Sequence, residues 1–358
     1  MKALLKETIA LYSPKVEEAL ERFLRKELAQ ARELSRFHEE YYANLKEYLL
    51  RGGKRLRPIA LVMAYRGVGG SDEQASIDAS ICVELLHNSS LIHDDIIDRD
   101  ELRRGGPTFH AKYRDWHRAV KASGDSEHFG LSLGILGGDI LFNLGFKALA
   151  YARFDEKLLV KALKLYVEAY QQLIDGVLLD TYLPLSEQVE EKEYLEMVRL
   201  KTAALFEKAI LIGATLGGAT DSQLKALSSY AVLSAQGFQI QDDIIGLFGE
   251  EEEIGKPVGS DIREGKMTLL VIKALELADE TNRNRLRKLL GKADLTREEV
   301  EEARNIVEST GALSYARQLA QDLVKLAKEK LREAEPSLTK HSMAFFEELA
   351  DFFIERTF

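Results

Sequence analysis

The sequence predicts an all-α protein. Apolar residues recur at the helical period in nearly every segment, most clearly over 158–173, 224–238 and 313–331, with Glu, Lys and Arg on the opposite faces. The alternation of β-branched residues that is typical of strands is nearly absent. The chain has no low-complexity linker and no convincing internal repeat, so residues 1–358 are predicted to form one large helical domain.

Helix-capping residues, prolines and glycines predict where the individual helices begin and end. Ser71 with Gln74, and Thr296 with Glu299, have the spacing of a capping box, which predicts helix starts at both places. We expect prolines where helical patterns start or break, and the chain has six: Pro14, Pro58, Pro107, Pro184, Pro257 and Pro336. Two stretches, 99–110 and 246–268, combine glycine with charge and are predicted to be functional loops.

Composition restricts the class of partner and the compartment. The net charge is -10, which argues against the broad basic face of a nucleic-acid binder. The single cysteine, Cys82, excludes an intramolecular disulfide and lies in an apolar stretch, where we expect it to be buried. The first residues contain no apolar signal core, and no apolar run reaches the roughly 20 residues of a membrane span. The sequence therefore predicts a cytoplasmic protein without a transmembrane segment.

The first chemical motif is an aspartate cluster at residues 93–98 (His-Asp-Asp-Ile-Ile-Asp), after the apolar stretch 77–92. On a helix, Asp94 and Asp98 would stand one turn apart on the same face, with Asp95 to one side. Like charges at that spacing repel, so the arrangement favours a bound cation. Carboxylates that share a hard cation with substrate phosphates are how proteins usually hold Mg²⁺. The alternative is an acidic surface turn.

A second pair, Asp242 and Asp243, again follows an apolar helix and precedes the loop 255–268, which contains Lys256 and Lys266. Two helices ending in paired carboxylates could face each other across a cavity. A diphosphate between them would be bridged by Mg²⁺, which would also stabilise it as a leaving group. The two lysines would place positive charge on the phosphate oxygens, unless they are simply solvated.

Other phosphate and hydrolase motifs do not fit. The stretch 259–266 resembles a P-loop, but five residues separate its glycines instead of four, Met267 follows the lysine, and no strand precedes it. The sequence has no paired-histidine zinc motif and no serine nucleophile elbow. These absences argue against a nucleoside triphosphatase, a zinc enzyme and a serine hydrolase.

Two basic clusters stand out in this acidic chain. Residues 52–58 (Gly-Gly-Lys-Arg-Leu-Arg-Pro) place three cations within four residues, next to glycines that permit close backbone approach. Arg103 and Arg104 follow the first aspartate motif. Because arginine offers forked donors to phosphate, these residues are suited to a metal-free pocket for a second diphosphate.

Taken in order, these motifs resemble those of the trans-isoprenyl diphosphate synthases, the family of farnesyl and geranylgeranyl diphosphate synthases, with archaeal-type geranylgeranyl diphosphate synthases the most similar. The resemblance extends along nearly the whole chain: 52–58, His87, 94–98, 103–105, 138–139, 201–202, 238–243, 255–268 and 349–356. It implies a helical bundle around a central cavity, a homodimer, Mg²⁺, and isopentenyl diphosphate and allylic diphosphates as substrates.

The resemblance also implies a role for each matching residue. Asp94, Asp95 and Asp98 would hold Mg²⁺ on the allylic diphosphate, with help from Asp242 and Asp243. That diphosphate would be contacted by Arg103, Lys201, Lys256 and Lys266. Isopentenyl diphosphate would be held by Lys54, Arg57, His87 and Arg104. Thr202 and Gln239 would turn oxygen dipoles toward the developing carbocation, in a dry apolar cavity that suits such a species.

Product length is expected to depend on the helix upstream of Asp94. In the family, a bulky aromatic residue five positions before the first aspartate stops the growing chain early. This sequence has Ser89 there, followed by Ser90, so the cavity is predicted to stay open as far as Leu85 and Leu86, one turn deeper. Geranylgeranyl diphosphate is the expected product, with a longer product as the nearest alternative and farnesyl diphosphate after it. The two serines could instead bond to carbonyls of their own helix.

The sequence departs from the family pattern in two places. Gly246 stands where many relatives have a third aspartate, which bears on the occupancy of one metal site. The segment 115–127 is longer than in short relatives and is predicted to form a lid or a partner surface.

Three competing functions explain less. A class I terpene cyclase binds one diphosphate and has no need for Lys54 and Arg57. A non-catalytic subunit of a prenyl synthase usually lacks aspartates or the arginine pair, and this chain has both. A helical scaffold would not explain two separated aspartate pairs with basic loops.

Overall fold

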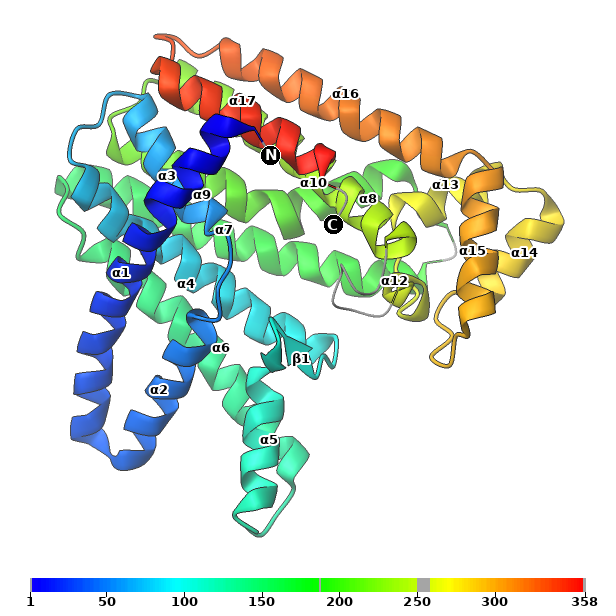
Figure 1. The fold of residues 1–358 in the computed structure, drawn as a ribbon, viewed down its shortest axis with the longest axis horizontal. Helices are drawn as coiled ribbons and strands as arrows, with labels where there is room; N and C mark the ends of the chain where they lie inside the picture. The colour runs from blue at the N-terminus through cyan, green and yellow to red at the C-terminus, as the bar shows by residue number, and fades with distance from the viewer. Residues whose placement is uncertain (1, 187, 250–257, 357–358) are drawn as a thin grey trace. The chain divides into compact units, whose positions relative to one another are not determined.

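The computed structural model describes residues 2–186, 188–249 and 258–356. The described chain is almost entirely helical, and its only strands are the two-residue β1 (Leu102–Arg103) and β2 (Gly106–Pro107). The predicted all-α class is confirmed (Figure 1). The chain forms two compact units, and we describe each separately: an N-terminal unit of Glu7–Tyr166 with Ala209–Ala219, and a C-terminal unit of Met1–Lys6, Val167–Lys208 and Thr220–Phe358. The single domain and its central cavity remain predictions.

The N-terminal unit is built on helices that pack around α3 and α4. Nine of the twelve residues of α3 are buried, which makes it a core helix. The helices of this unit are α1 (Ala3–Leu34), α2 (Arg36–Leu49), α3 (Leu56–Gly67), α4 (Glu73–Ile97), α5 (Phe109–Ala119), α6 (Ser126–Ala150) and the start of α7 (Glu156–Tyr182).

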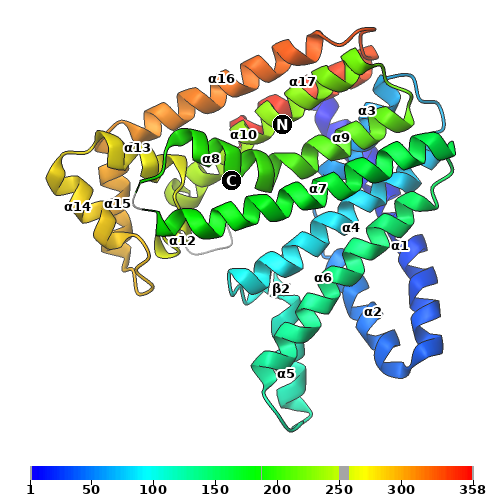
Figure 2. The same cartoon turned by 180° about the vertical axis from the view of Figure 1, so that it is seen from behind.

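Glycines allow α6 to lie directly against α4, as Figure 2 shows. A Cβ atom at Gly138 would come within 2.1 Å of His93 Nε2, and one at Gly145 within 2.9 Å of the Cys82 carbonyl oxygen. Neither contact leaves room for a side chain, so both positions require glycine. This close contact fixes the helix that carries the first aspartate motif.

The C-terminal unit has a core formed by α8, α10, α13, α15 and α16. Leu269, Val271 and Ala274 of α13 are fully buried there, against Val307 and Ala316. Its helices are the rest of α7 from residue 167, α8 (Glu191–Val198), the first turn of α9 (Ala204–Leu216), whose remainder belongs to the N-terminal unit, α10 (Asp221–Phe248), α12 (Ser260–Arg263), α13 (Leu269–Leu277), α14 (Glu280–Leu289), α15 (Arg297–Ser309), α16 (Ala312–Arg332) and α17 (Lys340–Glu355). Two short turns, η1 (Leu183–Leu185) and the π-helical η2 (Arg199–Ala203), flank α8.

The helix starts and breaks that capping boxes and prolines predicted were partly right. Thr296 and Glu299 form the predicted capping box of α15. At the start of α4 the prediction was wrong, because Asp72 rather than Ser71 is the cap: its carboxylate accepts from Ala75 N at 2.9 Å. Pro14 lies inside α1 rather than at a break. Proline removes one helical hydrogen bond, but the buried Tyr12 and Val16 hold the turns on either side of it.

One helix, α6, is long and apolar enough by length and composition to cross a membrane. Within the protein, 44% of that stretch is buried, and its glycine-rich face packs on α4. A core helix of a globular protein passes the same test, so α6 is weak evidence for a membrane span.

Candidate active site

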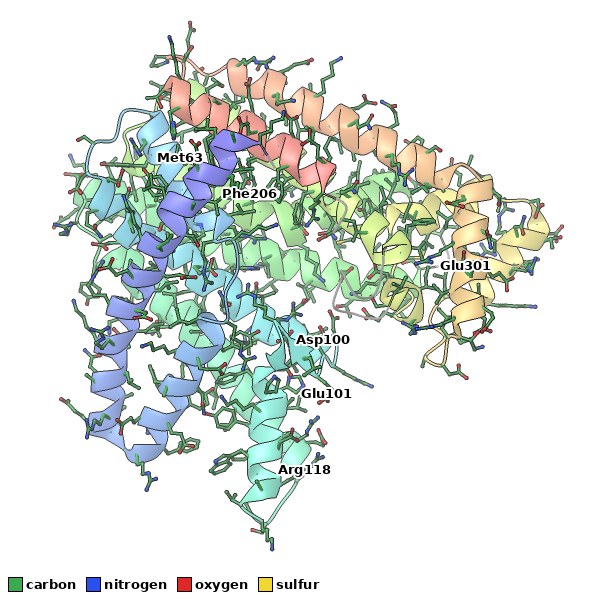
Figure 3. All side chains as sticks on the ribbon, viewed as in Figure 1. Met63, Asp100, Glu101, Arg118, Phe206 and Glu301 are labelled. Atoms are coloured by element: carbon green, nitrogen blue, oxygen red, sulfur yellow. The ribbon has the colours of Figure 1, made fainter. Side chains whose placement is uncertain are left out.

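The first aspartate motif occupies the end of α4, as predicted. Asp98 caps the helix, and its N–H donates to the Asp94 carbonyl oxygen at 2.8 Å, so the two carboxylates share a face one turn apart. Both are half-buried. Asp100 and Glu101 follow directly and lead into the β1–β2 hairpin (Figure 3).

Asp95 differs from its neighbours because it is fully buried. Its Oδ2 accepts from the Tyr48 hydroxyl at 3.0 Å, and its Oδ1 accepts from Arg103 Nε. Burial raises the pKa of Asp95 to about 6, although the positive charge of Arg103 opposes this shift. Arg103 also donates to Asp100 at 3.0 Å, so two carboxylates hold its guanidinium in place.

The basic segment 52–58 divides into one buried and two more accessible cations. Arg55 is fully buried, and its guanidinium donates to Glu84 of α4 at 2.5 Å and to the Leu49 carbonyl at 2.8 Å. Its φ of 52° turns the chain at the start of α3. Lys54 is consequently exposed and Arg57 half-buried. The family resemblance assigned substrate binding to Lys54 and Arg57 only, and the structure adds that Arg55 is paired inside the unit.

Arg57, His87 and Arg104 come together in the same unit. Arg57 Nη1 lies 3.4 Å from His87 Nε2, and Arg104 donates to the Gly52 carbonyl at 3.0 Å. A Cβ on Gly53 would touch the Arg104 guanidinium at 3.7 Å. Burial, with the positive charges of Arg57 and Arg104, keeps the pKa of His87 well below its ordinary value. The result is a neutral imidazole among arginines, an environment suited to an anion.

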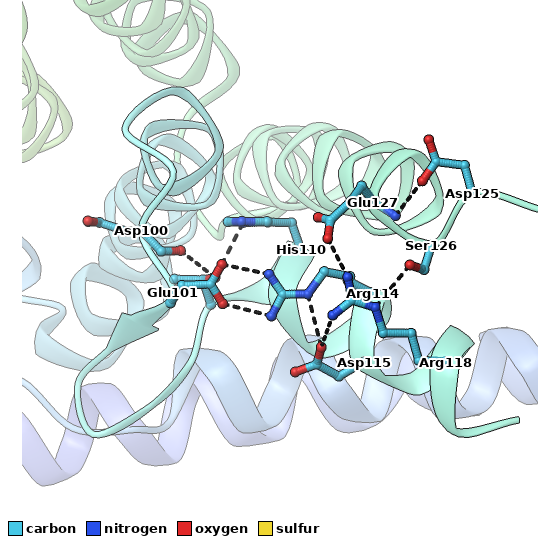
Figure 4. A network of polar contacts seen from close by, with 10 residues as sticks. Asp100, Glu101, His110, Arg114, Asp115, Arg118, Asp125, Ser126 and Glu127 are labelled. Carbon is cyan, nitrogen blue, oxygen red and sulfur yellow. Dashed lines mark hydrogen bonds and ion pairs between the residues drawn. The ribbon is translucent and has the colours of Figure 1, made fainter. Parts of the chain in front are cut away.

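A polar network holds the hairpin that carries Arg103 and Arg104 (Figure 4). Arg114 of α5 donates two hydrogen bonds to Glu101, at 2.6 and 2.7 Å, and one to Asp115 at 2.9 Å. Arg118 joins Ser126 and Glu127 at the start of α6. The segment 115–127 therefore comprises the end of α5, the turn that follows it and the start of α6, and its role as a lid or partner surface stays a prediction.

The second pair lies on α10. Asp243 is buried, and its carboxylate accepts from the Tyr194 hydroxyl at 2.6 Å and from Gln239 Nε2 at 2.9 Å. Burial, with the negative charge of Asp261, raises the pKa of Asp243. Asp242 is more exposed and pairs with Arg356, whose guanidinium lies 3.9 Å from the centre of the Phe238 ring.

Lys201 and Thr202 lie on the π-helical turn η2. Such turns often occur at functional sites. Thr202 Oγ1 donates to Gln239 Oε1 at 2.8 Å, so the sequence-predicted Thr202, Gln239 and Asp243 form a continuous chain of hydrogen bonds. Lys201 Nζ donates to Asp180 at 2.6 Å.

Two acidic residues were missed by the sequence analysis. Asp180 of α7 holds the Lys201 ammonium. Asp261 of α12 lies beside the gap left by Gly246, where a Cβ would come within 3.3 Å of Asp261 Oδ2. Burial raises the pKa of Asp261, and the positive charge of Lys266 opposes this. A carboxylate from another segment thus lies next to the position of the third aspartate. Lys266 lies near it and pairs with Glu264, whereas Lys256 is outside the described residues.

The residues expected to control product length are buried in α4. Leu85, Leu86 and Ser89 are fully buried. Ser90 bonds to its own helix, at the His87 carbonyl, but the Ser89 hydroxyl donates to the Gly138 carbonyl of α6 at 2.8 Å. Position 89 therefore faces the contact between α4 and α6.

The carboxylates suit a magnesium ion that is shared with a substrate. No three His, Cys, Asp or Glu side chains gather into a cation cage within the described part of the chain. The acids come instead as pairs, and magnesium is typically held by one or two carboxylates together with phosphate oxygens and water. With their basic neighbours, these pairs have the chemistry that suits binding of diphosphates together with divalent cations. How the two motifs face each other remains a prediction.

Comparison with known proteins agrees with this class. The profile of the polyprenyl synthetase family matches residues 38–307. A short chain isoprenyl diphosphate synthase of Methanothermobacter thermautotrophicus is 39% identical over 85% of this chain and 87% of its own. A geranylgeranyl diphosphate synthase of Saccharolobus solfataricus is 38% identical over the same shares, 85% and 87%. The structure of a geranylgeranyl pyrophosphate synthase from Corynebacterium glutamicum, complexed with isoprenyl diphosphate and magnesium, superposes with a TM-score of 0.90 at 28% identity, covering 98% of this chain and 99% of that one.

The chain belongs to the polyprenyl synthetase family. The predicted class of enzyme, a prenyltransferase, is confirmed, and so is the helical-bundle fold that the resemblance implied, known as the isoprenoid synthase fold.

Proposed function

We propose that this protein condenses isopentenyl diphosphate with dimethylallyl, geranyl and farnesyl diphosphates in the presence of Mg²⁺, and that geranylgeranyl diphosphate is the main product. The observation that carries the proposal is that the N-terminal unit contains two kinds of chemistry: the half-buried carboxylates Asp94 and Asp98 at the end of α4, and a cluster of Arg57, His87 and Arg104. The carboxylates suit a metal-bound diphosphate and the cluster suits a metal-free one.

Each cluster is assigned one substrate. Mg²⁺ bound at the aspartate motifs would neutralise the allylic diphosphate and make it a better leaving group. Arg103, Lys201 and Lys266 bind that diphosphate, with Lys256 as a further candidate. Lys54, Arg57, His87 and Arg104 bind isopentenyl diphosphate. Without ligand, the pKa of His87 is low, so its imidazole offers a hydrogen bond without adding to the positive charge of the arginines.

The proposed reaction has three steps. The bond between carbon and the diphosphate oxygen of the allylic substrate breaks, and the diphosphate leaves with the electron pair. The double bond of isopentenyl diphosphate attacks the resulting carbocation and forms the new carbon–carbon bond. A proton then leaves for the released diphosphate. The oxygens of Thr202 and Gln239 stabilise the cation as dipoles, because neither side chain is a strong nucleophile.

Product chromatography tests the function directly. The protein is incubated with labelled isopentenyl diphosphate and each allylic primer, with and without Mg²⁺. We expect labelled geranylgeranyl diphosphate with all three primers, and none without Mg²⁺. A main product of farnesyl or longer length would change the product assignment. Absence of any condensation would favour a non-catalytic subunit.

Ser89→Phe is expected to shorten the main product. We expect a phenyl ring at this fully buried position to occupy part of the proposed product cavity, although overpacking costs about 1–3 kcal/mol of stability. Ser89→Ala is the matched control, because it removes only the hydrogen bond to Gly138 and should preserve the product length. The readout is the product distribution. If Ser89→Phe yields the wild-type distribution, the floor of the cavity lies elsewhere.

We also propose a homodimer that uses α6. One face of this helix packs on α4, and the other carries a second apolar stripe with Leu131, Ile135 and Phe146, which are 36%, 50% and 36% exposed. A second copy of the same stripe would cover it. Ile135→Asp is expected to give a monomer by light scattering, whereas Leu277→Asp, a comparably exposed site at the end of α13, should not change the mass. A wild-type monomer, or a dimeric Ile135→Asp variant, would contradict the proposed dimer.

A cytoplasmic location remains a prediction.

A further inference from the structure

In both aspartate pairs, the second residue is buried and is held by a tyrosine hydroxyl. Tyr48 donates to Asp95 at 3.0 Å, and Tyr194 donates to Asp243 at 2.6 Å. The first residue of each pair, Asp94 or Asp242, is only half-buried. The two arrangements occur in different units and on different helices, so the bond between a tyrosine and the buried second aspartate is observed twice independently.

In the N-terminal unit, the Asp95 carboxylate connects Tyr48 with an arginine. Its Oδ1 accepts from Arg103 and its Oδ2 from Tyr48, so each oxygen has a partner. The Tyr48 ring is itself confined: Phe109 contacts it edge-on at a centroid distance of 6.0 Å, and the Arg51 guanidinium lies 5.2 Å above it. A rigid tyrosine therefore fixes the carboxylate, and the carboxylate fixes the guanidinium.

In the C-terminal unit, the buried aspartate connects its tyrosine with an amide side chain instead of a guanidinium. Asp243 Oδ2 accepts from Tyr194, and Asp243 Oδ1 accepts from Gln239 Nε2. The other end of the same amide accepts from Thr202 at 2.8 Å. Tyr194 is fully buried in the apolar core of this unit, so its hydroxyl has a fixed position. This series of hydrogen bonds, from Tyr194 through Asp243 to Gln239 and Thr202, determines the orientation of the Gln239 oxygen.

We propose that Tyr48 and Tyr194 are positioning residues, and that Asp95 and Asp243 act through the side chains they orient rather than as principal metal ligands. The inference rests on the proposed function. Tyr48 and Asp95 hold Arg103 in place for the allylic diphosphate. Tyr194 and Asp243 hold Gln239 in place for the developing carbocation. Principal metal contact is then left to the first aspartates and Asp98.

The two tyrosines should therefore affect different kinetic quantities. Tyr48→Phe is expected to weaken binding of geranyl diphosphate about tenfold, the scale of one hydrogen bond to a charged group, with kcat changed by less than about twofold. Tyr194→Phe is expected to lower kcat about tenfold and to leave that affinity within about twofold. Affinity is measured by calorimetry with Mg²⁺ present, and kcat by incorporation of labelled isopentenyl diphosphate.

The chain offers a matched control for each tyrosine. Tyr41, on the same helix as Tyr48, is buried and donates to the Leu133 carbonyl at 2.5 Å. Tyr230, on α10 with Asp243, is buried and donates to the Phe346 carbonyl at 2.7 Å. Tyr41→Phe and Tyr230→Phe lose the same chemical group and a similar hydrogen bond. Affinity and kcat should stay near the wild type in both.

A second comparison separates positioning from metal binding. Asp95→Asn should keep bound Mn²⁺ in the presence of geranyl diphosphate, measured by electron paramagnetic resonance, while Asp94→Asn should lose it. Loss of Mn²⁺ in Asp95→Asn, or equal behaviour of Tyr48→Phe and Tyr41→Phe, would overturn the inference. These binding measurements do not require turnover. If the wild type bound geranyl diphosphate but failed to condense it, the proposed function would fail while the Tyr48 comparison could still be made.

Discussion

Asp94→Ala is expected to reduce condensation by about three orders of magnitude, because metal stabilisation of a leaving group contributes several kcal/mol. The carboxylate stands half-buried at the end of α4, one turn from Asp98, and the hydrogen bond at the helix cap comes from the Asp94 backbone, which the substitution leaves in place. The fold should therefore survive. Incorporation of labelled isopentenyl diphosphate gives the rate, and circular dichroism with thermal melting reports the fold.

The control for this experiment lies on the same helix. Asp78 pairs with Arg22 at 2.6 Å on the surface of the N-terminal unit, and surface pairs contribute about 0–1 kcal/mol. Asp78→Ala should therefore behave like the wild type in both assays. The metal assignment of α4 fails if Asp94→Ala turns over at a rate close to that of Asp78→Ala.

Arg55→Ala is expected to destabilise the protein by about 3–5 kcal/mol, the cost of leaving one member of a buried ion pair without its partner. The Arg55 side chain has no exposed surface, and that of Glu84 is 4% exposed. Without the guanidinium, the Glu84 carboxylate would keep one hydrogen bond within the described residues, from the Asn88 amide at 3.0 Å. The change is measured as a shift of the urea unfolding midpoint, followed by circular dichroism.

Two further variants distinguish the buried pair from an ordinary one. Arg22→Ala removes an exposed partner of Asp78 and should cost no more than about 1 kcal/mol. Replacing both members, in Arg55→Met with Glu84→Leu, should recover much of the loss, because a well-packed apolar pair requires no compensation of charge. A midpoint for Arg55→Ala as high as that of Arg22→Ala would show that Glu84 does not depend on the arginine.

The buried pair also explains how neighbouring cations acquire different roles. Arg55 connects the start of α3 to α4 three residues before His87. Its left-handed conformation places its own side chain inside the unit and leaves Lys54 exposed. The residues proposed to bind isopentenyl diphosphate therefore stand next to a charge that faces the interior and is paired there with Glu84.

Local sequence was sufficient for the class of fold and for the positions of the two motifs. Helical period depends on residues three or four positions apart, so the helices around Asp94 and Asp242 could be predicted without tertiary contacts. The spacing of Asp94 and Asp98 predicted their shared face for the same reason. Their basic neighbours were recognisable because residue type and adjacency are both read directly from the chain.

Only the tertiary structure determined which side chains contact the aspartates of these motifs. Tyr48 meets Asp95 across 47 residues, Tyr194 meets Asp243 across 49, and Arg356 meets Asp242 across 114. Asp180 and Asp261 were missed because nothing in their own surroundings marks them; their importance comes from Lys201 and from the gap at Gly246. Such contacts depend on how helices pack, and packing is set by the burial of side chains from the whole chain rather than by any local pattern.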